Sequence, residues 1–291
     1  MSAASSRPCI VFSHGNSFPA GTYSVVFQAL RERGYRVTAV ERYGHDPRYP
    51  VTSNWPHLVQ QLADFAEAQV GLGDTPLFLV GHSLGGFLSL MCAARHPVLA
   101  GQPVRGVVML DSPVLGGWKA RALAAAKHTR LIGAVSPGQV SRKRRNRWAN
   151  AQEALEHFRH KRAFARWDPR VLADYIAHGT HDEHTPEGTQ RVLTFDRDTE
   201  TAIYNTLPHH LDRLLRRHPL SCPVAFVGGT QSEEMRRVGL TMTHKLCGRD
   251  PSERLQFIDG THLFPMEHPE ATAAAIDRAL RHFMAPVTAS S

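Results

Sequence analysis

Hydrophobic residues along the chain fall into short continuous runs separated by longer stretches of mixed polarity. The short runs are rich in Val, Leu, Ile and Phe and predict six β-strands, at residues 9–12, 35–40, 77–80, 104–110, 224–227 and 255–258. The longer stretches space their apolar residues as amphipathic helices do, at 22–33, 55–69, 84–95, 235–246 and 269–283. This alternation predicts an α/β fold, in which helices flank a mostly parallel sheet of about six strands.

The alternation is interrupted after the fourth strand. Residues 115–218 predict only helices and loops, with helices at 118–129, 148–166, 169–178 and 202–216. The same stretch holds 19 Lys and Arg but 11 Asp and Glu, so it carries a net charge of +8, which is that of the whole chain. Pattern and charge change at the same boundaries. We therefore predict a core formed by 1–114 and 219–291, with a helical insertion at 115–218.

The composition is that of a protein that folds around a hydrophobic core. The 291 residues are 42% hydrophobic and 21% charged, and a chain of this length buries enough surface to fold without disulfides or structural metals. The four cysteines lack CxxC spacing and are expected to be reduced. No apolar run approaches the roughly 18 residues of a membrane span, and no apolar leader is visible. We expect a cytoplasmic protein that does not associate with membranes.

Two polar clusters allow binding functions that the sequence does not favour. The densest basic run, at 141–147, is typical of a solvated surface, and no nucleic-acid-binding motif accompanies it, so we expect no nucleic-acid partner. His178, His181 and His184 have a spacing that can bind a metal. Glycine and proline nearby interrupt any helix, however, which favours a surface loop. The sequence predicts no metal site and does not indicate an oligomeric state.

The strongest chemical signal is the Gly-His-Ser-Leu-Gly-Gly segment at 81–86, which follows a predicted strand and opens a predicted helix. This G-x-S-x-G arrangement is a nucleophile elbow, a sharp turn that lifts the serine hydroxyl above the sheet. Glycine two residues to either side avoids the clash that a Cβ would make in so tight a turn. The start of the helix adds backbone N–H groups beside the hydroxyl. Ser83 is therefore the predicted nucleophile.

Two further turns at strand ends supply the partners that a serine nucleophile needs. The His-Gly-Asn segment at 14–16 ends the first strand, so the backbone N–H of Asn16, or of its neighbour Ser17, can pair with that of Leu84 as an oxyanion hole. His262 directly follows the last strand, where it can reach Ser83 as a general base. The chain holds 18 histidines, and its position selects this one.

These segments, with GTHLFPMEHP at 260–269 and the order of strands and helices, carry a resemblance to the α/β-hydrolase superfamily over nearly the whole chain. The resemblance implies an eight-stranded sheet with a helical cap between the sixth and seventh strands. Aligned in this way, the chain begins at the family's third strand, so the usual N-terminal hairpin is expected to be absent. The insertion at 115–218 occupies the place of the family's cap.

The acid that completes the triad departs from the family pattern. Relatives place it after the seventh strand in a Gly-x-x-Asp motif, but here the matching positions hold Gln231 and Ser232. Asp111, at the end of the preceding strand, is the favoured substitute, since some small bacterial esterases of this fold take their acid from that strand. Glu233 or Glu234 is the alternative. If Asp111 is the acid, the Ser232 hydroxyl is expected to help hold the histidine.

The residues and the resemblance together predict a serine hydrolase that cleaves carboxylic esters or thioesters through an acyl-enzyme. No cofactor is required for this chemistry, and the partner is a small-molecule substrate. The basic insertion raises the further hypothesis of a negatively charged substrate or leaving group, such as an acyl-CoA. Alternatives are an acyltransferase or perhydrolase that uses the same triad, and a non-catalytic ligand-binding relative.

Overall fold

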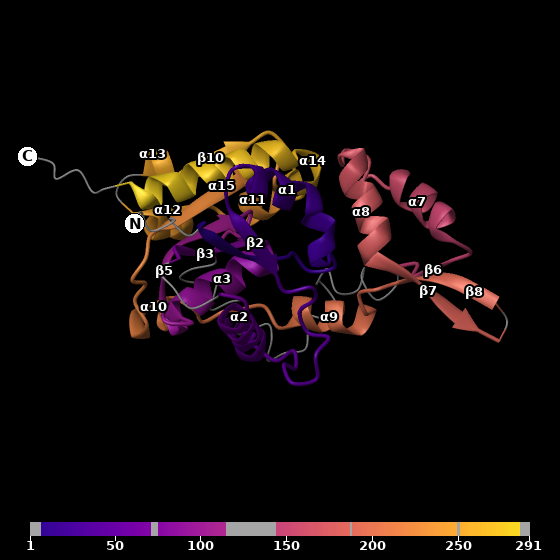
Figure 1. Cartoon of the computed structure of the whole chain (residues 1–291), viewed down its shortest axis with the longest axis horizontal. Helices are drawn as coiled ribbons and strands as arrows, with labels where there is room; N and C mark the ends of the chain where they lie inside the picture. The colour runs from indigo at the N-terminus through magenta and orange to yellow at the C-terminus, as the bar shows by residue number, and fades with distance from the viewer. Residues whose placement is uncertain (1–6, 71–74, 115–143, 187, 249–250, 286–291) are drawn as a thin grey trace, which may run out of the picture.

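A central sheet of parallel strands organises the molecule (Figure 1). The computed structural model describes residues 7–70, 75–114, 144–186, 188–248 and 251–285. The six parallel strands lie in the order β10-β9-β5-β3-β1-β2, and two-residue β4 (Val98–Leu99) pairs antiparallel with β5. Their bounds are β1 (Cys9–Ser13), β2 (Arg36–Ala39), β3 (Leu77–His82), β5 (Gln102–Leu110), β9 (Val224–Gly229) and β10 (Leu255–Ile258). The α/β fold and the positions of all six strands are thereby confirmed, and among the described residues no strand precedes β1.

Helices cover both faces of the sheet because successive side chains of each buried strand point to opposite sides. In β1, Ile10 and Phe12 join the hydrophobic cluster that contains the apolar faces of α1 and α15, whereas Cys9 and Val11 join the cluster of α2 and α3. These helices are α1 (Ser24–Glu32), α2 (Pro56–Gln69), α3 (Leu84–Arg95) and α15 (Pro269–Met284). Both faces of the strands are therefore buried, which is why the strand sequences are almost continuously apolar.

Short helices fill most of the connections. They are η1 (Ala20–Tyr23) before α1, α10 (Leu211–Arg217), α11 (Glu233–Val238), α12 (Thr241–Cys247) and α13 (Pro251–Arg254) around β9, and α14 (Phe264–Glu267) before α15. The single helix predicted at 235–246 is thus two helices, because Gly239 breaks it with a φ of 81°. Within the described residues, no helix has both the length and the apolar character needed to cross a membrane.

The insertion contains a small antiparallel sheet as well as helices, so the prediction of a purely helical insertion is wrong. It holds α7 (Ala151–Arg159), α8 (Pro169–Gly179) and α9 (Arg197–Asn205), and a sheet of β6 (Arg147–Trp148), β7 (Thr180–Thr185) and β8 (Gly188–Leu193). Figure 1 shows the β7–β8 hairpin extending away from the central sheet. Both strands are largely exposed and polar, so no apolar run marked them in the sequence. The helix predicted at 118–129 lies outside the described residues.

Glycine at the junction of β3 and α3 lets the chain turn against β1. Ser83, between the two elements, has a φ of 53° and a ψ of −116°. A Cβ on Gly85 would lie 1.9 Å from the carbonyl oxygen of Ser13, and one on Gly81 would lie 2.2 Å from the carbonyl carbon of Gly85. Because backbone atoms surround both positions, no side-chain rotation can make room. The elbow is therefore possible only with glycine at these two sites.

We expect Gly85→Ala to lower the free energy of unfolding by more than about 3 kcal/mol, since α3 must move away from β1. Gly101→Ala is the matched control, because Gly101 has a φ of 75° but no atom within 4 Å of the added Cβ. It should cost only the backbone strain, about 1–2 kcal/mol. Urea denaturation measures both losses. Gly85 lies within α3 and outside the left-handed region, so its loss must come from the clash, and a loss no larger than that of Gly101→Ala would contradict this explanation.

Candidate active site

Three polar side chains meet at the carboxyl ends of the parallel strands. Ser83 follows β3, Asp111 follows β5 and His262 follows β10. His262 Nε2 lies 3.0 Å from Ser83 Oγ, and its Nδ1 lies 2.9 Å from Asp111 Oδ1. A continuous hydrogen-bonded chain thus runs from hydroxyl through imidazole to carboxylate, drawn from segments up to 179 residues apart.

The carboxylate of Asp111 is fully buried and accepts hydrogen bonds from three separate elements. Besides His262, Ser232 Oγ donates to Oδ1 at 2.6 Å, and the backbone N–H of Gly229 donates to Oδ2 at 2.8 Å. Burial by itself raises the pKa of this carboxyl, but the hydrogen bond and charge of His262, with the other two donors, bring it below its ordinary value. Asp111 is therefore ionised. Separately, its backbone has a φ of 43°, which lies in the left-handed region.

The two alternative acids occupy different positions. Glu234 Oε2 lies 3.9 Å from His262 Nδ1, too far for a hydrogen bond, and half of its side chain is exposed. Glu233 forms ion pairs with Arg236 and Arg237 on its own helix, α11. Among the described residues, Asp111 is the carboxylate that hydrogen-bonds His262. Glu234 contributes a nearby negative charge.

The acidic surroundings of His262 change its protonation. Burial lowers the pKa of the imidazole, yet the hydrogen bond and charge of Asp111, together with the charge of Glu234, raise it above its ordinary value. An imidazole with a raised pKa accepts a proton more readily and holds it better as imidazolium. This is the property that a group needs if it is to take a proton from the Ser83 hydroxyl.

The two predicted oxyanion donors are Leu84, which directly follows Ser83, and Asn16, in the turn after β1. Leu84 is the first residue of α3, so its N–H has no acceptor within its own helix. Asn16 lies in the turn that a hydrogen bond from Phe18 N to Gly15 O closes, and it lines the same cavity as Ser83. Its side-chain amide donates to the backbone oxygen of Glu200 in α9, and the neighbouring Ser17 hydroxyl donates to the Glu200 carboxylate.

A second buried hydrogen-bonded chain connects the turn after β1 with the loop of His262, and neither of its two side chains was among the predicted site residues. The backbone N–H of Gly15 donates to Tyr23 Oη at 2.9 Å, Tyr23 Oη lies 2.7 Å from His82 Nδ1, and His82 Nε2 lies 2.9 Å from the carbonyl oxygen of His262. A carbonyl can only accept, so His82 carries its proton on Nε2 and accepts from the Tyr23 hydroxyl on Nδ1. Burial lowers the pKa of His82 to about 3, which keeps it neutral. The pair of Tyr23 and His82 ties the turn after β1 to the loop of His262, and the sequence signal was the histidine within the 81–86 motif.

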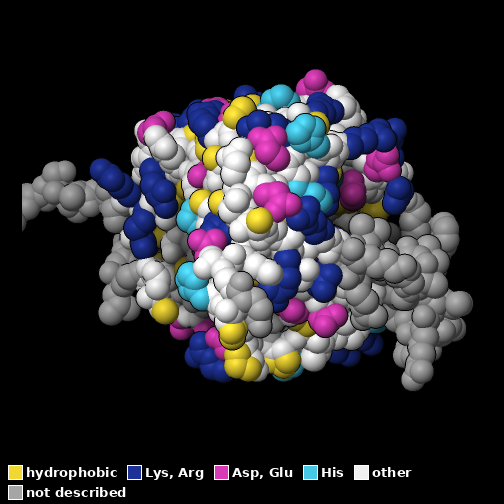
Figure 2. Space-filling view, turned by 90° about the vertical axis from the view of Figure 1, so that its right-hand side faces the viewer, with side chains coloured by type: hydrophobic (Ala, Val, Ile, Leu, Met, Phe, Trp, Pro, Cys, Tyr) yellow, Lys and Arg dark blue, Asp and Glu magenta, His cyan; other side chains and the backbone are white. Residues whose placement is uncertain are grey.

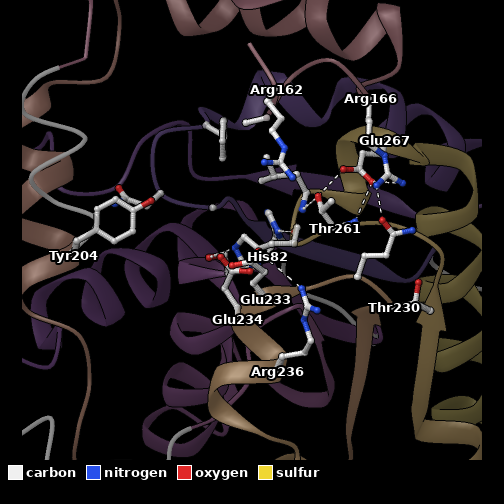
Figure 3. A pocket seen from close by; sticks show the side chains of 18 residues that line it. His82, Arg162, Arg166, Tyr204, Thr230, Glu233, Glu234, Arg236, Thr261 and Glu267 are labelled. Carbon is white, nitrogen blue, oxygen red and sulfur yellow. Dashed lines mark hydrogen bonds and ion pairs between the residues drawn. The ribbon is translucent and has the colours of Figure 1, made fainter. Parts of the chain in front are cut away.

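Ser83 and His262 face a cavity of about 920 Å³ that residues of both the core and the insertion line. In Figure 3, Arg162 and Arg166 enter it from one side, Glu233, Glu234 and Arg236 from the opposite side, and Tyr204 from a third. This volume is at the upper end of those typical for small-molecule sites. The site is therefore large enough for a substrate well beyond an acetyl ester.

Of the basic run at 141–147, the described residues 144–147 do not line this cavity. Its described arginines pair instead with acids of the insertion: Arg144 with Glu200, Arg145 with Glu153 and Arg147 with Glu183. On the face shown in Figure 2, Lys and Arg side chains are interspersed with Asp, Glu and His and form no continuous basic patch. Residues 141–143 lie outside the described part of the chain.

The three histidines at 178–184 do not converge on one point. His181 and His184 lie on strand β7, three residues apart and hence on opposite faces, and they contact Thr194 and Thr189. The prediction of a surface loop here is wrong, because the segment consists of the end of α8, which holds His178, and the exposed strand β7. In the described part of the chain, the group of side chains close enough to share a metal ion is Asp111, Glu234 and His262. Two of these already satisfy each other in the hydrogen-bonded chain with Ser83.

A sequence model of the Alpha/beta hydrolase family matches residues 10–275. Over 138 residues the chain is 25% identical to monoglyceride lipase of Mus musculus, which covers 46% of this chain and 44% of the mouse protein. Over 104 residues it is 27% identical to the esterase YjfP of Escherichia coli, which covers 32% of this chain and 42% of that protein. The chain thus matches less than half the length of these relatives.

Solved structures resemble the whole chain. The peroxisomal alpha-beta-hydrolase Lpx1 of Saccharomyces cerevisiae has a TM-score of 0.72 at 16% identity, covering 99% of this chain and 80% of that one. A thioesterase domain from the curacin biosynthetic pathway has a TM-score of 0.66 at 18% identity, covering 94% of this chain and 92% of that one. At such low identities these similarities establish the fold only.

Tyr23→Phe tests the buried chain beneath the site. The substitution leaves the N–H of Gly15 and Nδ1 of His82 buried without a partner, so we expect the free energy of unfolding to fall by about 2–4 kcal/mol. Tyr49→Phe is the control, since Tyr49 also loses a hydrogen bond, to Asp64, but at the surface. Urea denaturation should show a loss below about 1 kcal/mol for Tyr49→Phe. Similar losses in the two variants would contradict a special role of Tyr23.

Proposed function

Because this chain belongs to the Alpha/beta hydrolase family, we propose that it is a serine hydrolase that cleaves carboxylic esters or thioesters of small molecules. The observation that carries the proposal is the hydrogen-bonded chain of Ser83, His262 and Asp111 at the floor of a cavity. The names of its relatives, a monoglyceride lipase and an esterase, support hydrolysis of an ester bond.

The reaction proceeds through an acyl-enzyme. Ser83 Oγ attacks the carbonyl carbon of the substrate while His262 Nε2 removes the proton of the Ser83 hydroxyl. The product is a tetrahedral intermediate in which the former carbonyl oxygen carries a negative charge. The backbone N–H groups of Asn16 and Leu84 stabilise the oxyanion. As the intermediate collapses, His262 returns the proton to the leaving alcohol or thiol. Water, deprotonated by the same imidazole, then releases the acid from Ser83.

Asp111 supports this cycle without exchanging a proton itself. Its carboxylate accepts from Nδ1 of His262, which leaves Nε2 free to accept the proton from Ser83, and its charge stabilises the imidazolium that forms. Ser232 and Gly229 hold the carboxylate by hydrogen bonds to both of its oxygens. The charge of Glu234 adds to the stabilisation from the solvent side.

We also propose that residues 115–218 form the cap of this enzyme. Arg162, Arg166 and Tyr204 of the insertion line the cavity together with Ser83 and His262 of the core. A substrate that occupies the cavity therefore contacts both parts of the chain. The insertion is thus placed to select substrates, while the core supplies the groups for the reaction.

The nucleophile is tested by Ser83→Ala. We expect kcat/KM on p-nitrophenyl esters to fall by at least about 10³-fold, and covalent labelling by a fluorophosphonate to disappear. The control is Ser89→Ala in α3, the helix that follows Ser83, since the buried Ser89 hydroxyl has no hydrogen-bond partner among the described residues. Labelling that persists in Ser83→Ala would refute the assignment.

The acid is tested by two matched amides. Asp111→Asn removes the charge that orients and stabilises His262, so kcat should fall by about 10³-fold or more. Glu234→Gln should retain turnover within about tenfold. Activity requires neutral His262, whose pKa is raised by Asp111 and Glu234, so the acid limb of the wild-type pH–rate profile should lie at a higher pH than an ordinary imidazole would give. It should move to lower pH in Glu234→Gln, because one stabilising negative charge is lost. The reverse pattern of turnover would make Glu234 the acid.

A further inference from the structure

Six charged side chains line the cavity, three arginines and three glutamates, and their pairing is uneven. Glu267 accepts from the backbone N–H of Thr261 at 3.0 Å and lies 3.6 Å from Arg166. Arg166 also donates to Gln231 at 2.6 Å. Because both charges are held by protein groups, neither is available to a ligand without breaking existing contacts.

The two glutamates of α11 are also accounted for. Glu233 lies 2.8 Å from Arg237 and 3.8 Å from Arg236. Arg236, the arginine of α11 that lines the cavity, is therefore already paired with a carboxylate. Glu234 lies 3.9 Å from His262 and accepts a hydrogen bond from Ser232 at 3.4 Å. Its charge is therefore directed at the imidazole.

Arg162 remains without an opposite charge. It lies in the turn between α7 and α8, is exposed, and extends from the insertion toward the cavity (Figure 3). No carboxylate among the described residues forms an ion pair with it. Residues 115–143 of the same insertion, which the structure does not describe, contain no Asp or Glu at all. We therefore expect the ligand to supply the negative charge that pairs with Arg162.

We infer that the substrate carries an anionic group, a carboxylate or a phosphate, that binds Arg162 at the side of the cavity formed by the insertion. The inference rests on the proposed function, since it concerns the substrate of that same site. A guanidinium presents planar paired donors that match the oxygens of either group. Arg162 is exposed, so the attraction is moderate in water, and it strengthens as the bound substrate excludes solvent from the cavity.

The anionic group can belong to the acyl part or to the leaving group, and two substrate pairs distinguish these sources. A p-nitrophenyl hemiglutarate compared with its neutral methyl ester places the charge on the acyl side. Butyryl-CoA compared with S-butyryl-N-acetylcysteamine places it on the leaving group. Within each pair the reacting bond is the same, so a difference in kcat/KM reports on recognition of the charged portion.

The experiment compares wild type with Arg162→Gln and with the control Arg159→Gln, whose arginine lies in α7, pairs with Glu156 and does not line the cavity. We expect wild type to prefer the anionic member of one pair. Arg162→Gln should lower the ratio of anionic to neutral kcat/KM about tenfold, mainly through KM, a change equal to about 1.4 kcal/mol. Arg159→Gln should leave the ratio as in wild type.

Three results would overturn the inference: no preference in wild type, an unchanged ratio in Arg162→Gln, or an equal drop in Arg159→Gln. Hydrolysis of the neutral esters, abolished by Ser83→Ala, separately establishes the proposed function. If no ester is turned over, the proposed function fails, and calorimetric titration with monomethyl glutarate still tests Arg162. Binding that Arg162→Gln weakens would support the anion site, and binding that it does not affect would refute it.

Discussion

Burial of the Asp111 charge is the constraint on which the arrangement of the site depends. A carboxylate with no exposed surface is stable only if donors surround it, because its desolvation would otherwise cost several kcal/mol. The donors are the backbone N–H at the end of β9, the hydroxyl of Ser232 just before α11 and the imidazole after β10. The first two belong to the segment that joins β9 to α11, and the third belongs to the connection after β10. Satisfying one buried charge thereby fixes both segments relative to Asp111, and through His262 relative to Ser83.

The turn that carries the predicted oxyanion donor is held from two directions. From the core, Tyr23 accepts the N–H of Gly15 and connects it through His82 to the loop of His262. From the insertion, Glu200 contacts both Asn16 and Ser17 and pairs with Arg144, with all of these groups largely buried. The position of the insertion and that of the turn at Asn16 are therefore linked by direct contacts, even though the insertion contributes no group to the hydrogen-bonded chain of Ser83, His262 and Asp111.

The six parallel strands of the central sheet were predictable because strands that are buried on both faces consist of continuous apolar runs, which polar loops do not contain. The β7–β8 hairpin was not, since exposed strands such as Thr180–Thr185 carry no hydrophobic signal and are fixed by their partners. Ser83 and His262 followed from motifs at strand ends, where topology brings distant residues together. The role of Tyr23 could not be predicted, because in the sequence an aromatic residue in a short helix resembles any other core residue. Only the structure shows that its hydroxyl bonds both Gly15 and His82. The density of positive charge along the sequence did not predict the cavity lining, since the described arginines of the basic run pair with nearby acids.

The departure from the Gly-x-x-Asp pattern has a geometric explanation in the sheet. β5 and β9 are adjacent parallel strands, and the backbone N–H of Asp111 donates to the carbonyl of Val227 in β9. Moving the acid from the end of one strand to the end of its neighbour shifts it by about one strand spacing, roughly 4.8 Å, which the length of a carboxylate side chain and a change in loop path can absorb. The connection after β9 then no longer needs to supply the acid, and it supplies donors to it through Gly229 and Ser232. A hydroxyl at position 232 is thus the complement of a carboxylate at position 111, and the two residues form one hydrogen-bonded unit whose parts follow neighbouring strands.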